Sequence, residues 1–325
     1  MNRRNKGQRP WGVLAVIAAF STLVSLSLAG TASGEGGATR AERPPPIVKV
    51  GSKSDTEGAL LGSMIGLILE RAGIPVQYRL YFGPTPAVRQ AITVGDLDIY
   101  PEYTGNAALF FNLPDDPAWR DPGRAIAKAR ALDAPNGIVW LTPAPANNTW
   151  AVAVRQEVAG SNKSPTLDDF ARWVSGGGRV RLAASPEFVS SPAALPAFQK
   201  AYGFTLSSKQ ILLVSGGDTA DTIKAAAVGK YGVNAAMVYA TDGAIAAAGL
   251  KVLRDTKGVQ PVYQPTPVVR AAVLEAYPDL PKMLAPTFET LTVETLQELN
   301  ARVQFANEDP RSVAADYLRR RRLLR

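Results

Sequence analysis

Apolar positions in the first part of the folded chain alternate between strand-like runs and helix-like periods. Residues 47–50 form a short apolar run that predicts a buried strand, and the glycine and serines of 51–54 predict a turn. Ser54 and Glu57 have capping-box spacing ahead of an amphipathic pattern that we expect to end near Ala72. The next predicted elements are a strand, a helix and a strand, at 76–82, 87–94 and 97–100. This β-α-β-α-β series is typical of a parallel sheet with helices on its faces.

The same alternation repeats from residue 138 onward. Predicted strands lie at 138–141, 150–155, 180–184, 211–214, 235–239 and 250–254. Predicted helices lie at 166–173, 192–202, 218–227 and 244–248. After Val268 the pattern is mainly helical, most clearly at 293–305 and 310–320. We therefore predict two α/β lobes, each a mostly parallel sheet flanked by helices, with chain crossings at 147–151 and 254–261.

The N-terminal residues have the composition of a secretory signal. Four basic residues (Arg3, Arg4, Lys6 and Arg9) precede an apolar run at 11–29 and small residues at 30–32. We predict a cleaved signal peptide at 1–32, a glycine- and proline-rich linker at 33–46, and a mature protein in the periplasm. A retained membrane anchor is the alternative. Lobe 1 is then expected at 47–148 plus 256–325, and lobe 2 at 149–255.

The net charge of +8 is concentrated at the two ends of the chain. Removing the four basic residues of the signal and the five arginines of 319–325 leaves −1 for the rest. The rest of the chain has no excess of basic residues to bind phosphates, so nucleic acid is not an expected partner. The arginine-rich C-terminus is interpreted as a solvated helix end, with contact to anionic lipid or a partner as the alternative.

The chain contains 0 His and 0 Cys. These absences exclude a Ser-His-Asp triad, a cysteine nucleophile and a His or Cys metal site. The sequence has no Gly-x-Ser-x-Gly motif and no phosphate-binding Gly-Lys-Ser/Thr loop. We therefore expect neither an enzyme nor a cofactor, although an enzyme working with carboxylates or lysine is a remaining alternative.

Two segments of the first lobe point to one edge of the predicted sheet. Ser52 and Lys53 follow the first strand, and Tyr103 follows the third, in "DIYPEYTGN". Ligands collect at the carboxyl ends of the strands in such sheets. Tyr100 keeps the alternation of its strand and is expected to pack inward.

A secreted two-lobed chain without catalytic His or Cys looks like a solute-binding protein. The segments "VGSKSDTEGALLGSMIGLILE", "GDLDIYPEYTGN", "NNTWAVAV", "LPAFQKAYGF" and "VYATDGAI" resemble, in order, the osmoprotectant-binding proteins of bacterial ABC importers for glycine betaine, choline and carnitine. The resemblance runs from about Ile47 to the C-terminus. It implies a type II-like periplasmic binding protein fold with its ligand between the lobes. It also implies delivery to a membrane permease with its ATPase, and a monomer.

Members of this family hold quaternary amines in a box of aromatic side chains. A trimethylammonium group has a full charge and no N–H, so aromatic faces suit it. The resemblance places Tyr103 and Trp150 in that box, adds Tyr239 from the second lobe, and gives Asn148 a backbone carbonyl beside it. Lys53 matches the lysine that meets a ligand carboxylate. The alternative for Tyr103, Trp150 and Tyr239 is packing in the core, and the alternative for Lys53 is a solvated side chain in a turn.

Three positions depart from the family pattern. Asn106 stands where relatives often have Thr, and its amide can still donate a hydrogen bond. Ser191 stands near the position of an arginine that clamps a betaine carboxylate, and a hydroxyl does not replace a guanidinium. Ile223 stands where relatives often have an aromatic residue. These departures suggest a weak betaine binder or, as the alternative, a different small zwitterion such as an amino-acid derivative.

Overall fold

The computed structural model describes residues 45–162, 164–214 and 219–324. Residues 44–325 form one compact unit by their contacts. The predicted signal peptide, most of the predicted linker and the predicted start of a helix at Asp218 lie outside the described residues. Within the described ranges, no helix is both long enough and apolar enough to span a membrane.

The first sheet has five strands in the order β2-β1-β3-β10-β4. Four strands are parallel to one another, and β10 is antiparallel to both of its neighbours. The bounds are β1 Val48–Lys53, β2 Val76–Gly83, β3 Ile99–Tyr103, β4 Ile138–Trp140 and β10 Pro265–Arg270. Its helices are α1 Thr56–Arg71, α2 Thr85–Val94, α3 Ala107–Phe110, α4 Pro122–Asp133, α11 Ala271–Ala276, α12 Leu280–Phe288, α13 Val293–Gln304 and α14 Pro310–Arg320.

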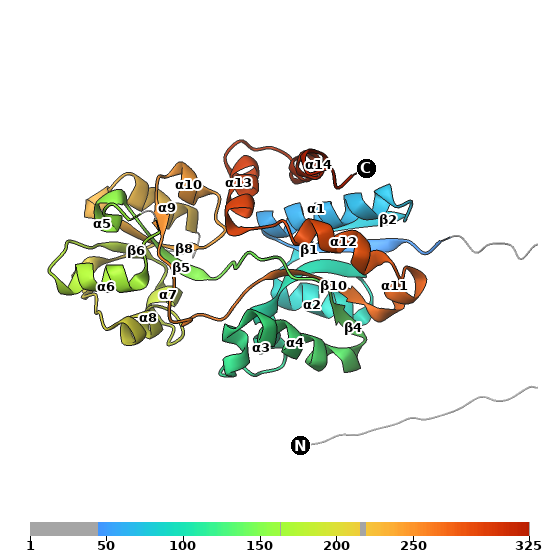
Figure 1. The fold of residues 1–325 in the computed structure, drawn as a ribbon, viewed down its shortest axis with the longest axis horizontal. Helices are drawn as coiled ribbons and strands as arrows, with labels where there is room; N and C mark the ends of the chain where they lie inside the picture. Colours follow the sequence, from blue (N-terminus) through green and yellow to red (C-terminus); the bar gives the residue numbers. More distant parts are fainter. Residues whose placement is uncertain (1–44, 163, 215–218, 325) are drawn as a thin grey trace, which may run out of the picture. The chain divides into compact units, whose positions relative to one another are not determined.

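The second sheet repeats this arrangement in the order β7-β6-β8-β5-β9, with β5 as the antiparallel strand. The bounds are β5 Trp150–Val154, β6 Leu182–Ala184, β7 Ile211–Leu213, β8 Ala235–Tyr239 and β9 Lys251–Val252. Its helices are α5 Gln156–Ala159, α6 Leu167–Ser175, α7 Pro186–Ser190, α8 Leu195–Tyr202, α9 Thr219–Ala227 and α10 Ala244–Ala247. Figure 1 shows the two sheets, each with its own helices, joined by two extended segments.

In each sheet the antiparallel strand is the one by which the chain enters from the other sheet. β5 follows residues 141–149, the first crossing segment, which leads away from β4. β10 follows residues 253–264, the second crossing segment, which leads away from β9. The prediction of two mostly parallel α/β lobes is confirmed. The exact lobe limits at 148/149 and 255/256 stay predictions.

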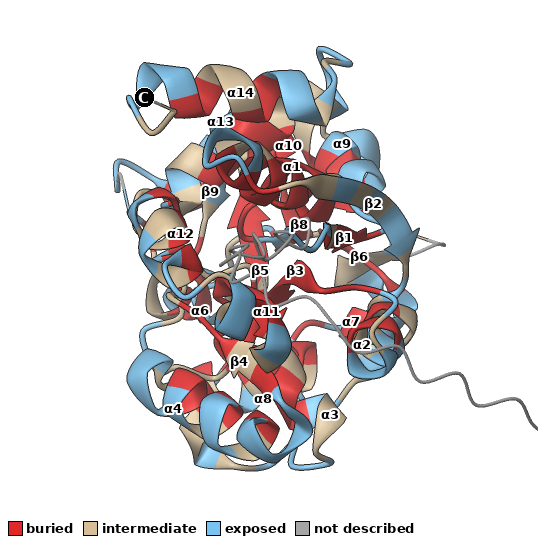
Figure 2. Cartoon of the chain, turned by 90° about the vertical axis from the view of Figure 1, so that its right-hand side faces the viewer, coloured by how far each residue is buried: buried red, intermediate tan, exposed pale blue. Residues whose placement is uncertain are grey.

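Both faces of each sheet are covered by apolar side chains. In the first lobe one cluster includes Val50, Leu61 and Phe288, and the other includes Tyr100 and Trp140. Two further clusters flank the second sheet. In Figure 2 the buried residues follow the strands and the helix faces turned towards them. Tyr100 packs inward as predicted.

Most predicted elements are present, with ends shifted by up to three residues, but α3, α4, α5, α7 and β10 were not predicted. β10 contains Pro265 and Pro267, and proline is usually absent from central strands because it lacks an N–H donor. Here Pro267 lies opposite Pro101 of β3, and the carbonyl of Pro267 accepts from Leu141 on the other side. The strand is therefore compatible with its prolines.

The beginning of the first lobe differs from the prediction in a way that matters for the site. The predicted turn at 51–54 is wrong because β1 continues through Lys53. The predicted capping box is also wrong: Asp55 caps α1, and its carboxylate accepts from the N–H of Gly58 at 2.6 Å. The side chain of Glu57 is thus free for contacts elsewhere.

Helix α13 packs against the turn that precedes α10, and this contact requires a glycine. A Cβ atom on Gly243 would lie 2.2 Å from the backbone nitrogen of Ala301. Gln297 and Asn300 of α13 also donate hydrogen bonds to the carbonyls of Ala240 and Thr241.

We predict that Gly243→Ala destabilises the protein by about 1–3 kcal/mol, because neither backbone can move without breaking these hydrogen bonds. Urea unfolding measures the change. Gly123→Ala in the exposed first turn of α4 is the matched control, and its expected effect is below about 0.5 kcal/mol. Equal stability of the two variants would contradict the close approach.

Candidate functional site

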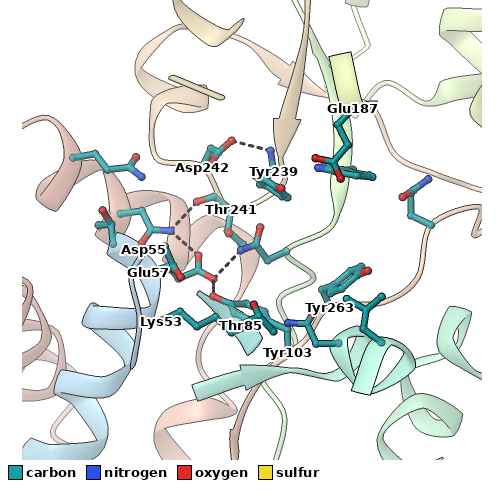
Figure 3. A pocket seen from close by; sticks show the side chains of 18 residues that line it. Lys53, Asp55, Glu57, Thr85, Tyr103, Glu187, Tyr239, Thr241, Asp242 and Tyr263 are labelled. Carbon is teal, nitrogen blue, oxygen red and sulfur yellow. Dashed lines mark hydrogen bonds between the residues drawn. The ribbon is translucent and has the colours of Figure 1, made fainter. Parts of the chain in front are cut away.

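A cavity of about 600 Å³ is lined by residues of both lobes. All six residues predicted for the site line it: Lys53, Tyr103, Asn106, Asn148, Trp150 and Tyr239. Figure 3 shows these side chains with others that sequence reasoning did not select, notably Glu57, Glu187, Thr241 and Tyr263. Residues that are far apart in the sequence therefore surround a single space.

The floor of the cavity is built on the buried carboxylate of Glu102 in β3. Its oxygens accept from Lys53 Nζ, from Tyr100 Oη at 2.9 Å, and from the backbone N–H of Tyr103 at 2.7 Å. Asn106 Nδ2 donates to the same carboxylate at 2.7 Å. These bonds satisfy the charge of Glu102, which is 0% exposed. They also hold Lys53 and Asn106 at the carboxyl ends of β1 and β3.

The ammonium group of Lys53 has a carboxylate partner inside the protein, and its predicted contact with a ligand carboxylate stays a prediction. Its ammonium group pairs with Glu102 and lies 4.6 Å from the centre of the Tyr103 ring. The prediction that Tyr103 follows the third strand is wrong: Tyr103 is the last residue of β3, because the strand extends to pair with Pro265 of β10.

A second buried carboxylate, Glu57, lies between the lobes. Its Oε1 accepts from Tyr103 Oη at 2.7 Å and from Asn148 Nδ2 at 3.1 Å. Its Oε2 accepts from Asn300 Nδ2 at 2.7 Å, and Asn300 also donates to the carbonyl of Thr241. Strand β3, the first crossing segment and helix α13 thus meet at one side chain.

Burial raises the pKa of Glu57 to about 7, although hydrogen bonds from Thr241, Tyr103 and Asn300 act in the opposite direction. The charge of Asp55 raises this pKa further. Among the described residues, no Lys or Arg nitrogen lies within 4 Å of the Glu57 carboxylate. Burial also raises the pKa of Tyr103 well above its ordinary value, and the nearby Glu57 charge adds to this effect.

Aromatic rings form another part of the wall. Trp150 and Tyr239 are opposite residues of β5 and β8, and their rings stack with centroids 6.4 Å apart. Phe188 meets the Trp150 ring edge-on at 5.9 Å. Tyr263 comes from the second crossing segment, and its ring lies so close to Gly105 that a Cβ there would be 2.7 Å away.

Acidic side chains outnumber basic ones in the lining. Lys53 is matched by Glu102, and the remaining charged residues of the lining are Asp55, Glu57, Glu187 and Asp242. No arginine belongs to the described lining. Of the three departures from the family pattern, Asn106 lines the cavity, whereas Ser191 and Ile223 lie outside it, and Ile223 is buried in the core of the second lobe.

Sequence reasoning missed Glu57, Tyr263 and Asn300. Glu57 was assigned to a capping box at the start of the helix. That local role accounted for the residue, so it was not considered as part of the site. Tyr263 and Asn300 reach the cavity only through the return of the chain from the second lobe. The predicted backbone role of Asn148 stays a prediction, while its side chain contacts Glu57.

Two lobes with one strand order around a shared cavity define the class of two-lobed periplasmic binding proteins. Residues 46–320 match the family described as the substrate binding domain of ABC-type glycine betaine transport systems, and the chain belongs to this family. The solved structure of apo YehZ from Escherichia coli superposes with a TM-score of 0.80 and covers 85% of this chain and 99% of its own.

Two curated relatives match most of the chain. The glycine betaine-binding protein YehZ of Escherichia coli strain K12 is 54% identical over 275 residues, which are 84% of this chain and 90% of YehZ. A glycine-betaine-binding protein of Pseudomonas aeruginosa is 32% identical over 283 residues, which are 85% of this chain and 88% of the relative.

We predict that Glu102→Ala lowers the free energy of unfolding by about 3–5 kcal/mol, because it leaves the buried ammonium of Lys53 unpaired. Urea unfolding measures the loss. Glu308→Ala, which removes a partly exposed carboxylate paired with Arg302, is the control and is expected to lose much less stability. A loss of the same size in both variants would contradict a central role for Glu102.

The raised pKa of Glu57 predicts that the stability of the folded protein depends on pH. Between about pH 4.5 and 7 the folded state keeps a proton that the unfolded state releases, so the contribution of Glu57 to stability falls as pH rises. Glutamine does not ionise. The melting temperature of Glu57→Gln minus that of the parent should therefore increase from pH 4.5 to about 7 and then level off.

Thermal melts at closely spaced pH values test this difference. Glu187→Gln is the control, because it makes the same substitution at an exposed acid that lines the same cavity. A flat difference for Glu57→Gln would show that Glu57 titrates normally.

Proposed function

We propose that this protein is the periplasmic binding subunit of an ABC importer and takes a quaternary ammonium compound between its two lobes. The observation that carries the proposal is the combination, in one cavity, of aromatic faces with an acidic lining and no described arginine. A quaternary ammonium group is attracted by both features, at about 0.5–2 kcal/mol for each aromatic face. Glycine betaine and choline are the first ligands to test, in view of the names of the relatives.

In the proposed site the trimethylammonium group contacts the rings of Tyr103, Trp150, Tyr239 and Tyr263. Asn148 and Asn106 provide polar contacts at its edge, and Lys53 adds a positive charge that Glu102 already balances. Closure of the two lobes over the ligand provides the conformation that the permease and its ATPase accept. We further propose that the protein works as a monomer, without a cofactor, after removal of its signal peptide.

A second candidate is a different small zwitterion, such as an amino-acid derivative. It is favoured by the absence of arginine from the described lining, because a free betaine carboxylate then lacks a bidentate partner. Calorimetric titration with glycine betaine, choline, carnitine and proline betaine separates the candidates. Lack of heat with all four would refute the quaternary amine and favour the second candidate.

We predict that Trp150→Ala weakens binding of choline or glycine betaine by roughly 3- to 30-fold, from loss of one cation–π contact. Trp150→Phe keeps an aromatic face and should lose less. Trp173→Ala is the control, since Trp173 is a partly exposed tryptophan of α6 outside this cavity. Unchanged affinity of Trp150→Ala would remove Trp150 from the site.

A further inference from the structure

We propose that Glu57 is the counter-charge for the ammonium group of the ligand, and that its carboxyl group releases a proton when a cation enters the cavity. This inference rests on the proposed function and names the group that recognises the charge. The exchange is balanced: the O–H bond of the neutral carboxyl breaks, the proton passes to solvent, and the carboxylate stays beside the ligand cation.

The hydrogen bonds of Glu57 prepare it for the ionised form. Tyr103 Oη, Asn148 Nδ2 and Asn300 Nδ2 all direct hydrogens at its two oxygens. A carboxylate that accepts several hydrogen bonds is stabilised in its charged form. These hydrogen bonds fix the position of the carboxylate in the cavity wall before a ligand binds.

Among the residues that the structure describes, Glu57 nevertheless has no positive partner within 4 Å. It is 6% exposed, and the nearest lysine of the lining, Lys53, is engaged by Glu102. A buried charge without a partner is expensive, so the empty site favours the proton, consistent with a pKa of about 7. A quaternary ammonium brings the missing charge but has no hydrogen to donate, so it can balance Glu57 only electrostatically.

Within the part of the chain that the structure describes, the neighbours of Glu57 on α1 and α13 supply no positive charge. Asp55 from the start of α1 repels its charge, and from α13 only the amides Asn300 and Gln304 line the cavity. The other titratable groups around the cavity in the first lobe are Lys53 of β1 and Tyr103 of β3, with Glu102 behind them. The second lobe contributes Glu187 of α7, Tyr239 of β8 and Asp242 of the turn after β8, and the second crossing segment contributes Tyr263. The acids Asp55 and Glu187 are exposed, so solvent already compensates their charge.

Calorimetric titration of the purified protein with choline and with glycine betaine tests the proposal, in phosphate and in Tris, from pH 5.5 to 8.5. Neither ligand changes its charge in this range. We expect release approaching one proton per ligand at pH 6, about half a proton at pH 7, and little at pH 8.5. Affinity should rise roughly tenfold per pH unit below pH 6.5 and level off above about pH 8.

Three variants identify the group. Glu57→Gln should bind with no proton release and no pH dependence, and about tenfold or more weaker than the parent at pH 8. Glu187→Gln should keep the proton release. Tyr103→Phe removes one donor from Glu57 and should move the midpoint of the pH profile upward, which a purely structural role of Tyr103 would not do.

The outcomes separate this inference from the proposed function. Binding by the parent with a pH-independent affinity and no buffer-dependent heat overturns the role of Glu57 and leaves the quaternary amine site intact. Proton release that persists in Glu57→Gln overturns it as well. If neither choline nor glycine betaine binds at any pH, the proposed function itself fails.

Discussion

A buried carboxylate must be satisfied by hydrogen bonds or by an opposite charge, and this constraint organises the centre of the molecule. Glu102 meets it with a lysine and several donors inside the first lobe. Glu57 meets it only in part, with donors drawn from β3, the first crossing segment and α13. The first carboxylate stabilises the floor of the cavity, and the second has no positive partner among the described residues.

The topology explains why these groups meet. In each sheet the chain arriving from the other lobe enters through the antiparallel strand, and the two crossing segments lie side by side between the sheets. Asn148 and Tyr263 belong to these segments, and the backbone N–H of Asn148 donates to the carbonyl of Tyr263 at 2.9 Å. Side chains on the crossings therefore face the carboxyl ends of strands from both sheets. The cavity is a consequence of the chain passing twice between the lobes.

Much of the architecture follows from local sequence. Alternating strand and helix periods predicted two α/β lobes, and motif resemblance selected six residues that line one cavity. Local reasoning failed where a longer-range partner decided the outcome. β1 continues through Lys53 because it pairs with β2, and β3 reaches Tyr103 because it pairs with β10. Proline disfavours central strands, and only the two neighbours of β10 show how Pro265 and Pro267 are accommodated.

The sequence by itself determined the fold class, the two-lobed organisation, and three aromatic residues that line the cavity, Tyr103, Trp150 and Tyr239, because hydrophobic period and motif order are properties of neighbouring residues. Only the tertiary structure decided which charges are paired and which are not. Glu57 reads in the sequence as an ordinary residue of a helix start. Its burial, its donors from distant segments and its missing counter-charge arise from how the lobes and α13 pack, and no local pattern encodes that arrangement.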